Sequence, residues 1–148
     1  MTLIERLAQE LKAAMIAKDA GRLSTLRLLK SAAGYAQIER GTESLTDAEV
    51  IALIQKEVKK RRDSVEQFEK GGRPELAGKE KEEITVLESF LPQPLAPDEL
   101  ELVIRAAIQE TGATSKKQMS QVIKAVQAKA AGRATGKSIS ELVGKLLP

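Results

Sequence analysis

The stretch Leu91-Pro-Gln-Pro-Leu-Ala-Pro97 divides this chain, because it places three prolines within six residues. Proline lacks a backbone N–H and fixes φ, so a run of this kind ends a helix and forms an extended connection. The sequence therefore predicts an N-terminal domain of residues 1–91, a proline-rich linker of residues 92–97 and a C-terminal domain of residues 98–148.

Before the linker, apolar residues recur three and four positions apart, and no alternating run of β-branched residues occurs, so four helices are expected. The first two are predicted to end at about Lys18 and Arg40, with Gly21 as the turn between them. A capping box at Thr46 predicts a long third helix, and Pro74 suits the first turn of the fourth. The second helix is apolar on more than one side, so we expect it to be the most buried of the four.

Several side chains of this domain can be assigned an expected environment from their spacing. Met15 shares a predicted inward face with Leu7 and Leu11, and the aromatic residues are expected in the core, which leaves no base-stacking platform. Arg61 or Arg62 falls in the apolar stripe of the third helix, where we expect the stem to cover apolar surface and the head to reach water or a carboxylate. The run Lys79–Glu83 is expected to be a solvated face.

After the linker the same periodicity predicts three further helices. Asp98 and Glu99 lie in the first turn of the fifth, which ends at Gly112, and either Thr114 or Ser115 caps the sixth. The seventh carries an apolar face from Ile139 to Leu147. The fold class is therefore predicted to be all-α, with an N-terminal four-helix unit followed by a C-terminal three-helix domain.

The composition excludes several kinds of chemistry. The chain of 148 residues contains no cysteine and no histidine, which removes thiol nucleophiles, thiolate metal sites and the commonest general base. Carboxylates are plentiful, but none is paired in a recognisable cleft. We therefore predict no catalytic residue, no metal and no cofactor. The N-terminus lacks a signal peptide pattern and no segment approaches a membrane span, so a cytoplasmic protein is expected.

The stretch Gly132-Arg-Ala-Thr-Gly-Lys-Ser138 resembles the loop that cradles nucleotide phosphates, but only three residues separate its glycines where that loop needs four. The residues before it, Met119–Ala131, have helical spacing, whereas a phosphate-binding loop follows a buried strand. We therefore expect a turn between two helices, with Gly132 ending one and Lys137 or Ser138 beginning the next.

Positive charge is concentrated at the C-terminal end of the chain. Residues 1–111 hold 17 Lys and Arg against 20 Asp and Glu, whereas residues 112–148 hold seven against Glu141 alone. A basic terminal third favours an anionic partner, with a solvated lysine-rich face as the alternative. A helix-turn-helix around Gly112 is a weak possibility, since only Gln118 and Gln121 would reach base edges. The residues expected to face RNA phosphates are Lys116, Lys117, Lys124, Lys129, Arg133 and Lys137.

Several segments, in this order, resemble the YqeY family over essentially the whole chain. They are Leu23–Lys30, Glu57–Ser64, Phe68–Pro74, Phe90–Leu95, Gly112–Lys116 and the Gly-x-x-x-Gly-Lys run of Gly132–Lys137. The part from about Ala96 is also similar to the helical tail domain of the GatB subunit of glutamine-dependent tRNA amidotransferases. That resemblance implies tRNA binding. It does not imply the carbon–nitrogen ligase reaction, because the phosphorylating and amide-transferring sites lie outside the tail.

The expected function is therefore non-catalytic binding of tRNA or another structured RNA, in association with an amidotransferase or a tRNA synthetase. Two alternatives stay open. One is a protein-interaction module whose long third helix docks a partner, and the other is an enzyme related to amide transfer that uses glutamine as the nitrogen donor.

Overall fold

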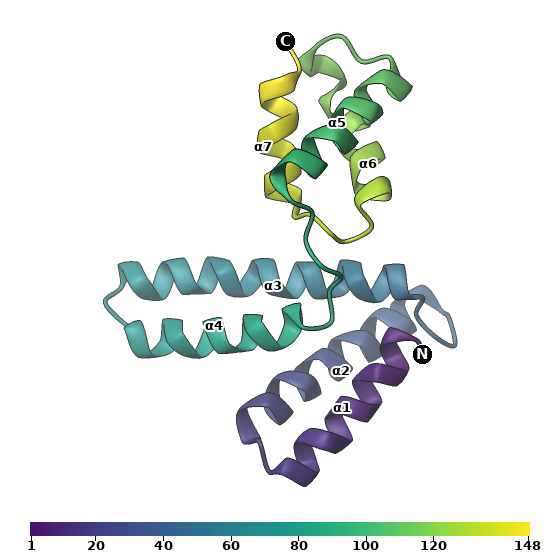
Figure 1. The fold of residues 1–148 in the computed structure, drawn as a ribbon. Helices are drawn as coiled ribbons and strands as arrows, with labels where there is room; N and C mark the ends of the chain where they lie inside the picture. Colours follow the sequence, from purple (N-terminus) through teal and green to yellow (C-terminus); the bar gives the residue numbers. More distant parts are fainter. The chain divides into compact units, whose positions relative to one another are not determined.

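The computed structural model describes residues 1–148, and its regular secondary structure is entirely helical (Figure 1). The predicted all-α class, with four helices followed by three, is confirmed. A short 3-10 turn, η1, precedes the sixth helix. The elements are α1 (Leu3–Ala17), α2 (Ala20–Arg40), α3 (Asp47–Lys70), α4 (Pro74–Glu88), α5 (Pro97–Thr111), η1 (Lys116–Gln118), α6 (Met119–Ala130) and α7 (Gly136–Leu146).

Contacts between residues divide the chain into two compact units, Met1–Leu91 and Pro92–Pro148. Each unit encloses its own hydrophobic core. In the first, the fully buried side chains include Leu26, Leu29, Ile54 and Leu87. In the second they are Ile104, Val122, Val126, Ile139 and Val143.

The N-terminal unit consists of two pairs of neighbouring helices, α1 with α2 and α3 with α4 (Figure 1). The capping box predicted at Thr46 is present at the start of α3, and a second one begins α1. At the start of α3, the Thr46 hydroxyl accepts a hydrogen bond from the Glu49 N–H at 3.2 Å, and the Glu49 carboxylate accepts from the Thr46 N–H at 3.0 Å. These bonds satisfy N–H groups that have no partner within a helix.

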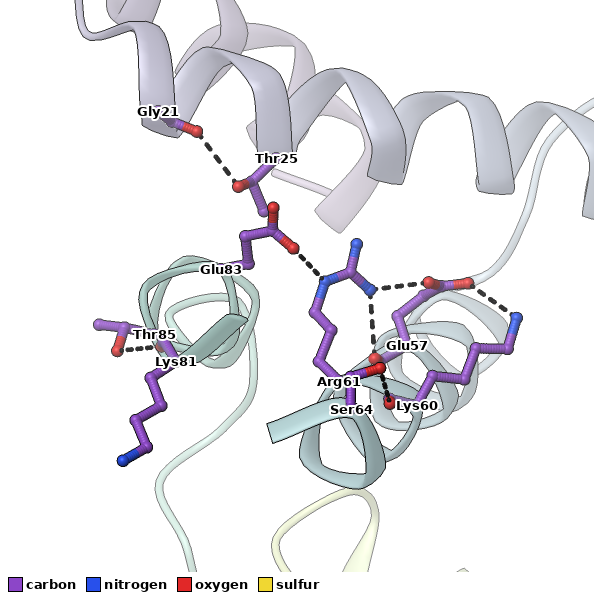
Figure 2. A network of polar contacts seen from close by, with 9 residues as sticks. All are labelled: Gly21, Thr25, Glu57, Lys60, Arg61, Ser64, Lys81, Glu83 and Thr85. Carbon is purple, nitrogen blue, oxygen red and sulfur yellow. Dashed lines mark hydrogen bonds and ion pairs between the residues drawn. The ribbon is translucent and has the colours of Figure 1, made fainter. Parts of the chain in front are cut away.

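The turn between α1 and α2 lies before Gly21, so the prediction that Gly21 forms this turn is wrong. Lys18 ends α1 in the left-handed region with φ of 56°, and the Asp19 carboxylate caps α2 by accepting from the Arg22 N–H at 3.1 Å. Lys18 therefore holds the left-handed position that glycine commonly takes at a helix C-terminus, and Asp19 is a preferred residue for capping the helix that follows. Gly21 lies in the first turn of α2, where its carbonyl accepts a bond from the Thr25 hydroxyl (Figure 2).

The second helix, predicted to be the most buried of its unit, has four buried residues where each of the other three helices has three, but it is covered on one side only. Its inward face is buried, but Leu28, Tyr35 and Ile38 are exposed. Tyr35 was expected in the core and is instead 76% exposed. The helix has apolar residues on two sides, and its unit covers only one of them. On α1, Met15 is likewise exposed, and Ala14 holds the buried position instead.

Arg61 joins α3 to α4 through carboxylates on both helices (Figure 2). Its Nη1 donates to Glu57 Oε2 and its Nε donates to Glu83 Oε2, both at 2.9 Å. Arg62, the next residue, is exposed and pairs with Glu88. The expectation that an arginine head reaches a carboxylate here is confirmed, whereas the prediction that the whole Lys79–Glu83 run is solvated is wrong at Glu83, whose side chain is 16% exposed.

The C-terminal unit includes part of the proline-rich segment. Leu95 packs against the core of this unit, and its N–H donates to the Arg133 carbonyl at 2.8 Å. The sixth helix begins after the 3-10 turn, so Ser115 precedes η1, and neither Thr114 nor Ser115 caps α6. No helix of the chain is both long enough and apolar enough to cross a membrane.

Candidate nucleic-acid interface

The turn between α6 and α7 contains the glycine-rich stretch that resembles a phosphate-binding loop. Ala131 ends α6 at φ of 48°, and Gly132 follows at φ of 86°. The Thr135 hydroxyl caps α7 by accepting from the Ser138 N–H at 3.1 Å, so α7 begins at Gly136, slightly earlier than predicted. The preceding element is a helix, which confirms that the stretch is an interhelical turn.

Lys137 lies in the first turn of α7 with its side chain exposed and without an ion pair or hydrogen bond. The first N–H groups of a helix have no partners within it, and the helix dipole places partial positive charge there. Lys137 therefore adds a full positive charge to a helix end that already favours anions.

Lys116 and Lys117 lie at the opposite end of α7. The Lys116 N–H donates to the Pro148 carbonyl at 3.1 Å, which places η1 beside the last residues of the chain. Since α7 contains 11 residues, its ends are separated by about 15 Å. Lys124 lies exposed along α6 between these ends. The structure thus distributes the predicted lysines along the unit and does not gather them in one cluster.

Two of the six predicted residues have partners within the unit. Lys129 forms an ion pair with Glu110 of α5, with Nζ and Oε1 2.7 Å apart. The Arg133 guanidinium donates to the carbonyl of Gln93 at 2.8 Å. Both side chains hold parts of this unit together, so their heads are less available to a ligand than those of the remaining four.

The four lysines whose side chains have no partner are Lys116, Lys117, Lys124 and Lys137. Lys145, in the last turn of α7, is a fifth exposed lysine without an ion pair. Sequence reasoning counted its charge but did not place it at the interface. The hydrogen bond from the Lys116 N–H to the Pro148 carbonyl brings η1 beside the end of the chain, near which Lys145 lies. This contact cannot be predicted from local sequence.

The acidic residues do not form a metal-binding arrangement, since no group of three or more suitable side chains comes together. Three pKa values depart from their ordinary values, and each has a structural cause in the N-terminal unit. Hydrogen bonds from Thr46 lower the pKa of Glu49, and one from Arg73 lowers the pKa of Glu75. Burial lowers the pKa of Arg61, but hydrogen bonds and charges of its two carboxylates raise it by more.

Fold and surface together define an all-helical protein in which a four-helix unit precedes a three-helix unit whose η1, α6 and α7 expose mainly basic side chains. The chain belongs to the YqeY-like family, whose model matches residues 4–147. The predicted family membership is confirmed.

The curated relatives are fungal proteins. One from Lachancea thermotolerans, named altered inheritance of mitochondria protein 41, mitochondrial, is 33% identical over 99 residues, or 67% of this chain and 53% of the relative. An uncharacterised protein of Schizosaccharomyces pombe is 39% identical over 70 residues, or 47% of this chain and 56% of the relative. A Pyrenophora tritici-repentis protein with the first name is 28% identical over 150 residues, covering 95% of this chain and 81% of the relative.

The match spans about half the length of the first two relatives. The names of the altered inheritance of mitochondria proteins refer to mitochondria but specify no biochemical activity.

Proposed function

We propose that this protein binds structured RNA, tRNA in particular, through its C-terminal unit and catalyses no reaction itself. The observation that carries the proposal is the set of exposed lysines without partners on α6, α7 and η1, in a region that holds Glu141 as its single acidic residue. Phosphate contacts supply most of the sequence-independent affinity for nucleic acid. The unit contains no aromatic side chain, so recognition would depend on phosphates and helical shape.

The resemblance of this unit to the tail of tRNA-dependent amidotransferases favours tRNA over other RNA. On this proposal the protein acts in the cytoplasm as an accessory to an amidotransferase or a tRNA synthetase. It would hold tRNA while another protein performs the carbon–nitrogen ligase chemistry.

The direct test is the affinity for total tRNA measured over a salt series by filter binding. Each phosphate contact contributes about 0.7 to 0.9 to the slope of log affinity against log salt. Replacement of Lys116, Lys117, Lys124 and Lys137 with Ala is expected to weaken binding and to flatten the slope by about two to four units.

The matched control removes the same charge from the other unit. Lys12, Lys56, Lys59 and Lys79 are exposed and form no ion pair, so their replacement with Ala is expected to leave the salt slope nearly unchanged. Equal losses of tRNA affinity in the two quadruple variants would mean that the effect depends on net charge alone. Unchanged binding in the C-terminal variant would refute the interface.

The absence of catalysis is tested separately. Purified protein with glutamine, ATP and glutamyl-tRNA is expected to form no glutaminyl-tRNA until an amidotransferase is added, as measured by chromatography of the released amino acids. Turnover by the protein alone, lost in a point variant of it, would show that it is an enzyme.

A further inference from the structure

The outward face of α2 is a line of exposed residues, none of which belongs to the buried core of its unit. Its members, Ser24, Leu28, Ser31, Tyr35 and Ile38, are spaced alternately four and three apart, so they lie along one side of the helix. Leu28 is 50% exposed and Ile38 is 79% exposed. We call this line the α2 outer stripe.

The first half of the stripe borders a shallow hollow. The hollow, of about 310 Å³, is lined by Ala20, Leu23, Ser24, Arg27, Leu28 and Ser31. The second half carries the larger apolar side chains. A spacing of this kind matches the seam of paired helices, in which side chains of one helix fit between those of the other.

Arg27 lines the hollow and has no partner. The chain contains nine arginines, and the other eight each donate a hydrogen bond or form an ion pair. Lys30, on the same edge of the helix one turn later, also lacks an ion pair. No carboxylate lies on the stripe itself. Arginine and tyrosine are enriched at the energetic centre of protein interfaces, and the stripe carries Tyr35 with the unpaired Arg27 at its edge.

We propose that the α2 outer stripe docks an amphipathic helix of another protein. That helix would place apolar residues three and four apart against Leu28, Tyr35 and Ile38, and an aspartate or glutamate against Arg27. The apolar part would supply most of the affinity. The ion pair would set the direction and register of the docked helix.

A second copy of this chain fits the stripe less well than such a helix. In a symmetric antiparallel pair of α2 helices, each edge of one helix lies against the same edge of the other. Arg27 and Lys30 of one copy would then face Arg27 and Lys30 of the second copy, and the like charges would repel. In a parallel pair opposite edges meet, but Glu39 lies twelve residues beyond Arg27, about 18 Å along the helix. RNA is also disfavoured, since its phosphates require several cations and the stripe offers mainly apolar surface.

In the test, a photoreactive phenylalanine analogue replaces Ser31, in the middle of the stripe, in the full chain. The protein is produced in cells, and illumination of the cells cross-links the analogue to any molecule bound there. The expected product joins Ser31 to a segment of another protein with the stated apolar spacing and an acidic residue. The same analogue at exposed Lys59 on α3 is the control and is expected not to capture that segment. A cross-link to a second copy, to the C-terminal unit, to RNA or to no molecule would overturn the proposal.

The cross-linked segment, made as a labelled peptide, then tests the charge pairing by fluorescence anisotropy. Arg27→Glu is expected to weaken binding at least tenfold, and replacing the peptide's acidic residue with Arg is expected to restore it. Lys59→Glu changes charge equally on another helix and is expected to leave the affinity unchanged. Because Arg27 has no partner, its variant should keep the circular dichroism of the parent. Failure of the charge swap would overturn the proposal, while the C-terminal lysine variant should bind the peptide normally.

Discussion

At the scale of single residues, Arg61 shows how one position decides the fit of two helices. Its side chain is 12% exposed, and it donates to carboxylates on α3 and α4. Removal of one partner from a buried ion pair leaves uncompensated charge, which costs more than the intact pair contributes. Arg61 therefore has a structural role in this contact.

The expected cost can be measured against the neighbouring arginine. Arg61→Ala should lower the free energy of unfolding by about 2 kcal/mol, less than the roughly 3–5 kcal/mol of a fully buried pair, because some water reaches the site. Arg62→Ala breaks an exposed pair and should cost about 0.5 kcal/mol. Urea denaturation followed by circular dichroism compares the two. Equal effects would contradict the structural role given to Arg61.

The sequence placed both arginines near the apolar stripe but could not choose between them. The choice depends on Glu83, which lies 22 residues after Arg61 and on another helix. Local spacing carries no information about such a partner. For the same reason the sequence did not reveal that Lys129 and Arg133 are paired within the C-terminal unit, while Lys124 is not.

At the scale of helices, the start of α3 links stability to pH. Hydrogen bonds from Thr46 lower the pKa of Glu49 below its ordinary value of 4.5. A lowered pKa in the folded state means that the carboxylate stabilises the fold at neutral pH and loses this contribution as pH falls below about 4.5.

Glu49→Gln should therefore reduce stability at pH 7 and bring the variant closer to the parent as the pH approaches 3, because only the parent loses the carboxylate. Thermal midpoints measured between pH 7 and pH 3 test this expectation. Glu82→Gln, on the exposed side of α4, is the control. A constant gap between the parent and the Glu49 variant across this range would contradict the assigned hydrogen bonds.

Helix number, order and most boundaries could be predicted because they depend on local signals. The capping box at Thr46 and Pro74 mark helix starts that the structure reproduces, and α2 ends at Arg40 as predicted. The one-sided burial of α2 could not be predicted. Its sequence shows apolar residues on two sides, but which side is covered depends on how many helices its unit supplies.

At the scale of the whole molecule, the proline-rich segment is part of the second unit. Leu95 packs into that core, and the Gln93 carbonyl accepts a bond from Arg133. A fragment of residues 92–148 should therefore fold alone and be more stable than one of residues 98–148, which lacks these contacts. Thermal unfolding of both fragments by circular dichroism provides the measurement. If the shorter fragment were equally stable, residues 92–97 would be a linker only, as the sequence suggested.

The pairing of α1 with α2 and of α3 with α4 also bears on how quickly the chain reaches its fold. Helices that follow one another in sequence pack together, so most contacts close short loops at little entropic cost. Folding rates rise as the sequence separation of contacting residues falls. We therefore expect the N-terminal unit to fold within microseconds to milliseconds, which would allow it to form before translation of the C-terminal unit is complete.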